Sequence, residues 1–264
     1  MADIRVRGVL LDLGGVVYVG DTPLAGALNA IRRLRQAGLA LRFLTNTTRR
    51  STRRLLADLA VIGLDLAPGE LLTPAQLART YLVAHRLTPH LLVHANLEEE
   101  FADLPSDLPP GEREAVVVGD AAERFSFQNL NAAYRKLEAG AEFLALAENR
   151  NFMDADGRLS IDAGAFVRAL EYASGRTATV LGKPSQMFFR LAVEALGCAP
   201  GEAVMVGDDT EADVGGALAA GLEGVLVRTG KYHPGDEAAL DPPPTHVAND
   251  LAAAVDWILG LRQK

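Results

Sequence analysis

Short apolar runs alternate with segments of helical spacing at both ends of this 264-residue chain, and this alternation limits the fold more than any other feature. Between residues 22 and 37, leucine and isoleucine recur every three or four positions, which is typical of a helix with one buried face. Strands that alternate with helices favour a parallel sheet, so we expect an α/β fold with a Rossmann-like core. The expected strands are 7–13, 39–46, 203–209 and 224–230, and the expected helices are 22–37, 53–63, 211–221 and a last one from 249 or 250 onward.

A second block of strand and helix patterns, residues 79–178, lies between these two ends. Its strand candidates are HLLVHA, EAVVVGD and EFLALAEN, and FQNLNAAYRKLEAG is a helix candidate. An insertion at a surface loop leaves the core of the host domain intact. We therefore expect a core domain made of residues 1–78 and 179–264, and an inserted α/β domain at 79–178 in which the stretch 103–114 is a loop.

The composition argues against several classes of protein. A formal net charge of -8 disfavours a nucleic-acid surface, so RRSTRR at 49–54 is interpreted as the solvated face of a helix, with steering of anions as the alternative. No apolar run is long enough to span a membrane, and MADIRVRG lacks the apolar core of a signal peptide. Cys198 is the sole cysteine and is interpreted as a small core residue. We expect a cytoplasmic protein that binds neither nucleic acid nor a membrane.

Polar residues follow the expected strands of the core domain, at the edge where ligands bind in an open parallel sheet. The first strand ends in Asp12 and turns through Gly14 and Gly15, and the second ends in Thr45 and Asn46. A carboxylate at the end of a buried strand is costly to desolvate unless a donor or a metal faces it. The other polar residues expected at this edge are Lys183, Asp208, Asp209 and Asp213.

These residue types suit a metal ion and a phosphoryl group. Converging carboxylates repel each other unless a cation lies between them, and a set of oxygen ligands suits Mg2+. Lys183, Thr45 and Asn46, with the backbone amides around Gly14, supply the positive charge and the donors that a phosphoryl group requires. An aspartate beside that group can act as a nucleophile and form an aspartyl-phosphate. The sequence thus predicts a metal on one side of Asp12 and a phosphate on the other.

The order of these motifs resembles that of the haloacid-dehalogenase-like (HAD) superfamily. The motifs are Asp-Leu-Gly-Gly at 12–15, Thr-Asn at 45–46, Gly-Lys-Pro at 182–184 and GDDTEAD at 207–213. With a block inserted between the second and third motifs, the chain is similar to subclass IIA, in which a C2-type cap domain covers the active site. The resemblance extends over essentially the whole chain. It implies a phosphatase that uses Mg2+, acts on a small phosphorylated substrate and forms a homodimer.

The resemblance also implies a role for each acidic residue of the motifs. Asp12 would be the nucleophile and a Mg2+ ligand, with Asp208 and the backbone carbonyl of Gly14 as further ligands. Asp209 and Asp213 would act from behind this shell, through water or by orienting the motif lysine. Capping of the following helix is the alternative for these two residues.

The remaining motif residues would bind the phosphoryl group. The resemblance implies that Thr45 and Asn46 bind its oxygens, with the backbone of Leu13 and Gly14 contributing to the same site. Lys183 would neutralise charge between the nucleophile and the phosphate.

Position 14 departs from the pattern of the family, in which most phosphatases read Asp-x-Asp-Gly and the second aspartate protonates the leaving group. Gly14 has no side chain for this task. General acid–base assistance contributes about 100- to 10,000-fold in rate, so alkyl phosphates are expected to react poorly. We expect a bias toward aryl and acyl phosphates, pyrophosphate and phosphoramidates.

Two other functions remain open at this point. A binding or regulatory protein could keep the phosphate site with little turnover, and Gly14 is the main evidence for it. Dehalogenation of small haloacids also uses an aspartate nucleophile, but it needs no metal, and the paired acids of GDD favour metal-dependent chemistry.

Substrate choice is expected to lie in the inserted domain. The candidates are Asn149 with Arg150, and the turn Asp162–Gly164, with ordinary loop and N-cap roles as the alternative. The five histidines show no metal-ligand spacing.

Overall fold

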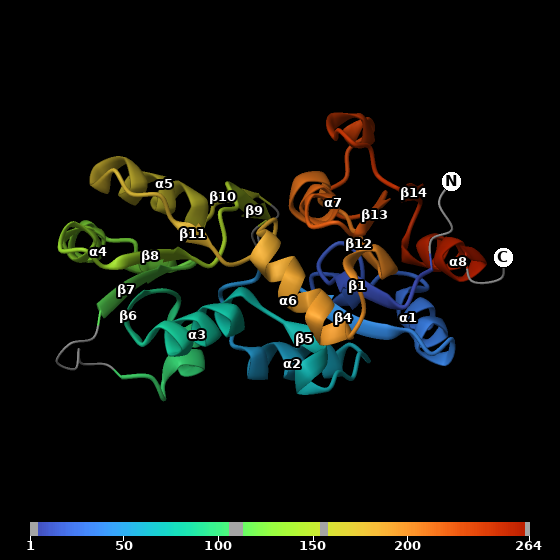
Figure 1. The fold of residues 1–264 in the computed structure, drawn as a ribbon, viewed down its shortest axis with the longest axis horizontal. Helices are drawn as coiled ribbons and strands as arrows, with labels where there is room; N and C mark the ends of the chain where they lie inside the picture. Colours follow the sequence, from blue (N-terminus) through green and yellow to red (C-terminus); the bar gives the residue numbers. More distant parts are fainter. Residues whose placement is uncertain (1–4, 106–112, 154–157, 262–264) are drawn as a thin grey trace. The chain divides into compact units, whose positions relative to one another are not determined.

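The computed structural model describes residues 5–105, 113–153 and 158–261 and divides the chain into two compact units (Figure 1). The first unit consists of Met1–Thr45, Leu56–Leu72 and Lys183–Lys264, and the second of Asn46–Leu55 and Thr73–Gly182. The chain passes from the first unit to the second at 72/73 and returns at 182/183, a few residues from the expected domain boundaries at 78/79 and 178/179. Residues 46–55 are an addition to the second unit that the sequence analysis did not anticipate.

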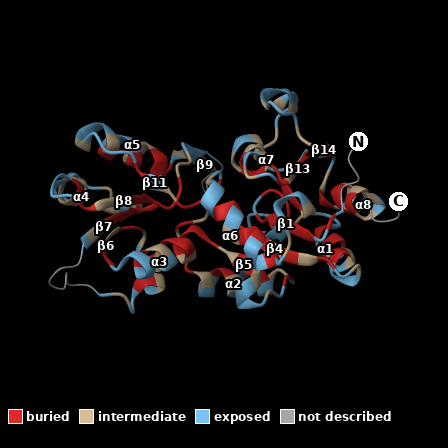
Figure 2. Ribbon diagram, in the orientation of Figure 1, coloured by how far each residue is buried: buried red, intermediate tan, exposed pale blue. Residues whose placement is uncertain are grey.

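A six-stranded parallel sheet forms the centre of the first unit, which confirms the expected α/β fold. Every residue of β1 and β12 is buried, as apolar runs in a sheet covered by helices require (Figure 2). Strand β1 lies between β12 and β4, so the ends of these three strands lie at one edge. The strand order is β14 (His246–Ala248), β13 (Glu223–Val227), β12 (Ala203–Gly207), β1 (Gly8–Asp12), β4 (Ala40–Leu44) and β5 (Leu71–Leu72).

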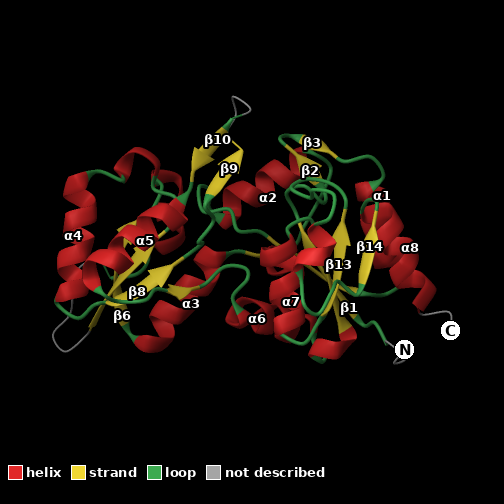
Figure 3. Ribbon diagram, turned by 90° about the horizontal axis from the view of Figure 1, so that it is seen from above, coloured by secondary structure: helices red, strands yellow, loops and turns green. Residues whose placement is uncertain are grey.

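Helices pack against this sheet in two groups. Helices α1 (Ala27–Gln36) and α8 (Leu251–Leu261) lie side by side, and α6 (Gln186–Leu196) packs against the short α7 (Gly216–Ala219) (Figure 3). Helix α2 (Thr52–Val61) begins in the second unit and continues in the first. Short 3-10 turns at Pro68–Glu70, Pro200–Glu202 and Asp236–Ala239 complete the unit.

Two expected helices of this unit differ from the structure. The helix expected at 22–37 begins only at Ala27, because β2 (Tyr18–Val19) and β3 (Thr22–Pro23) pair as a small hairpin. The helix expected after β12 is a π-helical turn, Thr210–Gly215, followed by α7.

The second unit contains its own four-stranded parallel sheet and helices α4 (Phe127–Glu138) and α5 (Ala163–Ser174) packed on each other. Side chains from the sheet and these two helices form its apolar core. The first of these strands ends at Leu92, earlier than HLLVHA suggested, and part of the loop expected at 103–114 lies outside the described residues. The remaining elements are α3 (Pro74–His85), β6 (Leu87–Leu92), the 3-10 turns Ala95–Phe101 and Ala122–Arg124, β7 (Arg113–Val118), β8 (Glu142–Ala145), the hairpin of β9 (Asn151–Met153) and β10 (Leu159–Ile161), and β11 (Thr179–Val180).

The basic cluster at 49–54 is bound to acidic side chains of the second unit rather than simply solvated. Arg49 contacts Asp120 and stacks over the Phe152 ring at 4.3 Å. Arg53 and Arg54 pair with Glu99 and keep large exposed fractions. These contacts explain why residues 46–55 group with the second unit. Among the described residues, no helix has the length and apolar character needed to cross a membrane.

Candidate active site

The expected site residues of the first unit come from the carboxyl ends of its central strands. Asp12 is the last residue of β1, Thr45 follows β4 directly, and Asp208 follows β12 directly. All three residues are buried, at 7%, 7% and 3% exposure. The backbone N–H of Thr45 donates to Leu72 O at 3.3 Å, which fixes the turn after β4. The parallel sheet therefore assembles residues that lie far apart in the sequence.

Lys183 lies between two carboxylates in the interior of the unit. Its Nζ donates to Asp12 Oδ1 and, at 2.6 Å, to Asp213 Oδ1, and only 4% of its side chain is exposed. Burial alone would lower the pKa of Lys183, but the Asp12 and Asp213 carboxylates raise it above its ordinary value. The lysine is therefore held in its charged form beside the expected nucleophile.

Asp12, Asp208 and Asp213 can each direct one carboxylate oxygen to a common point, because these oxygens lie within 4.8 Å of one another. Burial raises the pKa of all three; the Asp213 charge adds to this for Asp208, and the Lys183 charge opposes it for Asp213 and Asp12. The pKa of Asp208 and that of Asp213 are raised to about 6. The cluster thus carries unfavourable negative charge in a buried place.

This donor set fits a divalent cation. Three carboxylates and one ammonium carry a net charge of 3 × (-1) + 1 = -2, which one divalent ion balances. Oxygen ligands are those that Mg2+ prefers. Asp213 is engaged on both oxygens, since Oδ1 accepts from Lys183 and Oδ2 accepts from the backbone N–H of Asp209 at 3.1 Å. It thus holds Lys183 directly, the orienting role that the family resemblance implied.

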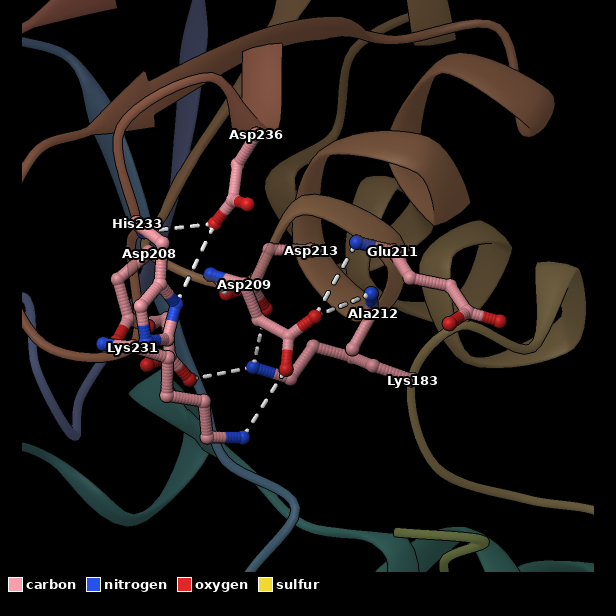
Figure 4. A network of polar contacts seen from close by, with 10 residues as sticks. Lys183, Asp208, Asp209, Glu211, Ala212, Asp213, Lys231, His233 and Asp236 are labelled. Carbon is pink, nitrogen blue, oxygen red and sulfur yellow. Dashed lines mark hydrogen bonds and ion pairs between the residues drawn. The ribbon is translucent and has the colours of Figure 1, made fainter. Parts of the chain in front are cut away.

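Asp209 has a different environment from its neighbours. Its Oδ1 accepts from the backbone N–H groups of Glu211 and Ala212 at 3.2 and 2.9 Å, and its Oδ2 accepts from Lys231 Nζ at 3.0 Å (Figure 4). Burial works against its charge, but Lys231 and these donors hold the pKa of Asp209 below its ordinary value. Asp209 therefore caps the turn that follows β12, which is the alternative role considered for it, and it also forms an ion pair with Lys231 that the sequence did not predict.

Glycine is required at two motif positions for lack of space. A Cβ at Gly207 would overlap the Asp213 side chain, so glycine lets this carboxylate pack on the end of β12. A Cβ at Gly182 would lie 2.7 Å from Asn46 Oδ1. Asn46 belongs to the second unit, whereas Thr45 belongs to the first.

Gly14 is exposed and stands in the turn after β1, where a Cβ would meet no atom within 4 Å. The position where the family carries an aspartate therefore has room for a side chain. Leu13 has a fully buried side chain, so only its backbone can act, and this backbone works to lower the pKa of Asp12.

A cleft of about 400 Å3 opens beside the acidic cluster. Lys231 and the 3-10 turn Asp236–Ala239 form one wall, and the π-helical turn after β12 forms another. Its lining residues are Asp208, Asp209, Thr210, Glu211, Lys231, Asp236, Ala239 and Leu240.

The specificity candidates of the second unit have structural roles there. Asp162 caps α5, accepting from the N–H of Ala163 at 2.6 Å, and its own N–H donates to Arg150 O. The N–H of Gly164 donates to Asn149 O at 3.1 Å. These contacts match the loop and N-cap alternative. Within the described residues, no group of potential metal ligands includes a histidine.

Comparison with known proteins gives the same family as the motifs. The family model described as haloacid dehalogenase-like hydrolase matches residues 9–105, and the model described as HAD-hydrolase-like matches residues 180–254. Phospholysine phosphohistidine inorganic pyrophosphate phosphatase from Danio rerio is 42% identical over 261 residues, which cover 96% of this chain and 94% of that protein. Haloacid dehalogenase-like hydrolase domain-containing protein 2 from Homo sapiens is 41% identical over 254 residues, which cover 96% of both chains.

Solved structures agree with this result. Glycerol phosphate phosphatase from Mycobacterium tuberculosis in complex with magnesium superposes with a TM-score of 0.81 and 27% identity, covering 95% of this chain and 77% of that one. Together, the motif order, the fold and the relatives show that the chain belongs to the haloacid dehalogenase-like hydrolases, as an enzyme of the phosphatase type.

Proposed function

We propose that this chain is a Mg2+-dependent phosphatase that acts through an aspartyl-phosphate on Asp12. The observation that carries the proposal is the buried Asp12, bonded to Lys183 and clustered with Asp208 and Asp213. A buried nucleophile beside a lysine and a divalent-cation site has a clear use in phosphoryl transfer and no evident use in a structural protein. The phosphatase relatives and the neighbour in complex with magnesium support the same choice.

Each residue has a chemical role in this proposal. Asp12 attacks the phosphorus of a small phosphorylated substrate, and the leaving group departs; water then hydrolyses the acyl phosphate. Lys183 offsets the charge that gathers between Asp12 and the phosphoryl oxygens. Thr45, Asn46 and the Leu13–Gly14 backbone bind and orient these oxygens.

The cation would be held by Asp12, Asp208 and the backbone carbonyl of Gly14, and it would neutralise negative charge on the phosphoryl group when bound. Asp213 orients Lys183 through their 2.6 Å contact. Because Asp213 already accepts donors on both oxygens, it is better suited to orienting the lysine than to direct ligation.

The absence of a side chain at Gly14 restricts the substrates. No carboxylic acid at this position can protonate a departing alkoxide, so the favoured substrates release a group that is stable without that proton. These are aryl and acyl phosphates, pyrophosphate, and phosphoramidates whose nitrogen is protonated before the P–N bond breaks. The name of the Danio rerio relative covers substrates of the last two kinds.

Phosphate release from a short panel tests the proposal. The panel contains p-nitrophenyl phosphate, acetyl phosphate, pyrophosphate, imidodiphosphate and a sugar phosphate, each with Mg2+ and with Asp12→Asn as the control. We expect turnover of the activated substrates by the wild type alone. Efficient hydrolysis of the sugar phosphate would contradict the substrate bias, and no Asp12-dependent turnover on any compound would favour the binding protein that Gly14 also permits.

A further inference from the structure

The loop after β13 reaches across the end of β12 to the turn after β1. These three strands are neighbours in the sheet, with β12 in the middle. Thr229 Oγ1 donates to the backbone carbonyl of Gly15 at 2.6 Å, which joins the two outer loops over Asp208. Nothing in the four family motifs required this connection, because Thr229 belongs to none of them.

One oxygen of Asp208 is enclosed by this connection. The backbone N–H of Lys231 donates to Asp208 Oδ2 at 2.7 Å. A Cβ at Gly15 or at Gly230 would overlap this same oxygen, and a Cβ at Gly230 would also lie 2.6 Å from Gly15 Cα. Both glycines have left-handed backbones, with φ of 80° and 59°. Space and backbone conformation therefore both require glycine on each side of Oδ2.

The second oxygen of Asp208 has a different environment. Among the described residues no donor bonds to Oδ1, and this oxygen is not fully enclosed by the protein, although Asp208 as a whole is only 3% exposed. An accessible oxygen on a largely buried carboxylate is open to a cation, and carboxylate oxygens are ligands that Mg2+ accepts. The cluster of Asp12, Asp208 and Asp213 oxygens supplies the place for that cation.

We propose that Gly15, Thr229, Gly230 and the backbone of Lys231 form a clamp that fixes Oδ2 of Asp208, so that Oδ1 alone is presented to the divalent cation. This inference rests on the proposed function, because it assigns a purpose to the clamp only if Asp208 is a metal ligand. Gly230 and Thr229 are thus positioning residues for metal binding. Partners that orient metal ligands typically change metal affinity by about 10- to 100-fold when they are mutated.

The side chain of Lys231 is separate from the clamp. Its Nζ pairs with Asp209, and 61% of the side chain is exposed. Because the donor to Asp208 is a backbone N–H, Lys231→Met keeps the clamp and removes the positive charge together with its ion pair to Asp209. Mg2+ binding should not weaken in this variant, since the loss of a nearby cation leaves the site more negative.

Calorimetric titration of the full chain with Mg2+ tests the clamp, with Gly20→Ala as the matched control. Gly20 has φ of 58°, close to that of Gly230, but a Cβ there meets no atom within 4 Å. Gly230→Ala should weaken Mg2+ binding about tenfold or more. Gly20→Ala introduces the same backbone strain and should keep Mg2+ affinity within about twofold of the wild type. Lys231→Met should lose no more than about twofold in affinity and can bind Mg2+ more tightly.

A milder variant covers the case in which Gly230→Ala does not fold, as judged by thermal unfolding. Thr229→Val removes the hydroxyl that holds the loop to Gly15 and adds no bulk, so a several-fold loss of Mg2+ affinity is expected. Unchanged affinity in the folded clamp variants would overturn the clamp and leave the proposed function intact. Failure of the wild type to bind Mg2+ would instead overturn the proposed metal dependence and the clamp with it.

Discussion

Placing an acid at position 14 tests the claim that the lack of a side chain there limits the enzyme to substrates with good leaving groups. Gly14→Asp places a carboxylic acid where most phosphatases of the family carry one. The structure leaves room for it, because a Cβ meets no atom within 4 Å and Gly14 is outside the set of left-handed glycines. The position is exposed, so the added charge remains solvated. Folding should therefore be little affected.

The expected gain follows from the proton that the new side chain donates. General acid–base assistance is worth about 100- to 10,000-fold, or about 2.7 to 5.4 kcal/mol of transition-state stabilisation, for a leaving group that needs the proton. An aryl phosphate gains little because its phenolate leaves readily. The ratio of kcat/KM for an alkyl phosphate to that for p-nitrophenyl phosphate should therefore rise by about 100-fold or more.

The assay is a plot of log kcat/KM against the pKa of the leaving group for a series of phenyl and alkyl phosphates. The wild type should give a steep slope, and Gly14→Asp a shallow one. Gly14→Asn is the matched control, because it has nearly the same shape and donates no acidic proton. Equal slopes for wild type and Gly14→Asp, or the same change in Gly14→Asn, would refute the reasoning.

Three further outcomes are expected. Lys183→Met leaves Asp12 and Asp213 buried without their cation, so urea unfolding should show a loss of about 3 to 5 kcal/mol at neutral pH; a loss below about 1 kcal/mol would contradict the ion-pair account. Because the pKa of Asp208 and that of Asp213 are about 6 in the fold and 3.8 is their ordinary value, the folded state binds more protons between about pH 4 and 6. Stability of the metal-free chain should thus fall as pH rises through this window, and Mg2+ should raise Tm more at about pH 7.5 than at about pH 5; an equal rise at both would count against carboxylate ligation. Asp209→Asn keeps an oxygen for the N–H groups of Glu211 and Ala212 but loses the ion pair to Lys231. Calorimetry should therefore show a Mg2+ affinity within about threefold of the wild type. A loss of affinity as large as that of Asp208→Asn would make Asp209 a metal ligand.

The strands and the strand-end residues could be predicted because they depend on local pattern and one general rule. The apolar runs at the start of the chain and before GDD became β1 and β12, which are buried throughout. Parallel strands bring their carboxyl ends to one edge, so the order of the strands and their last residues was enough to place Asp12, Thr45 and Asp208 near each other.

Features that depend on contacts between distant segments could not be predicted in the same way. The hairpin of β2 and β3 delays α1 to Ala27, and nothing in the spacing of its leucines marks that start. Arg49 looks like a solvated residue in RRSTRR, yet it pairs with Asp120 and stacks on Phe152. Lys231 acts on Asp208 through its backbone, which no residue-type pattern reveals.

Trapping of the phosphoryl group on the chain is the most direct test of the central claim. Rapid mixing with acetyl phosphate and Mg2+, followed by borohydride, converts an acyl phosphate into a primary alcohol that peptide mass spectrometry can locate. The account predicts homoserine in place of aspartate at position 12 in the wild type, and no such product without Mg2+ or in Asp12→Asn. Phosphate release at full rate without any modified residue, or with modification at another aspartate, would contradict it.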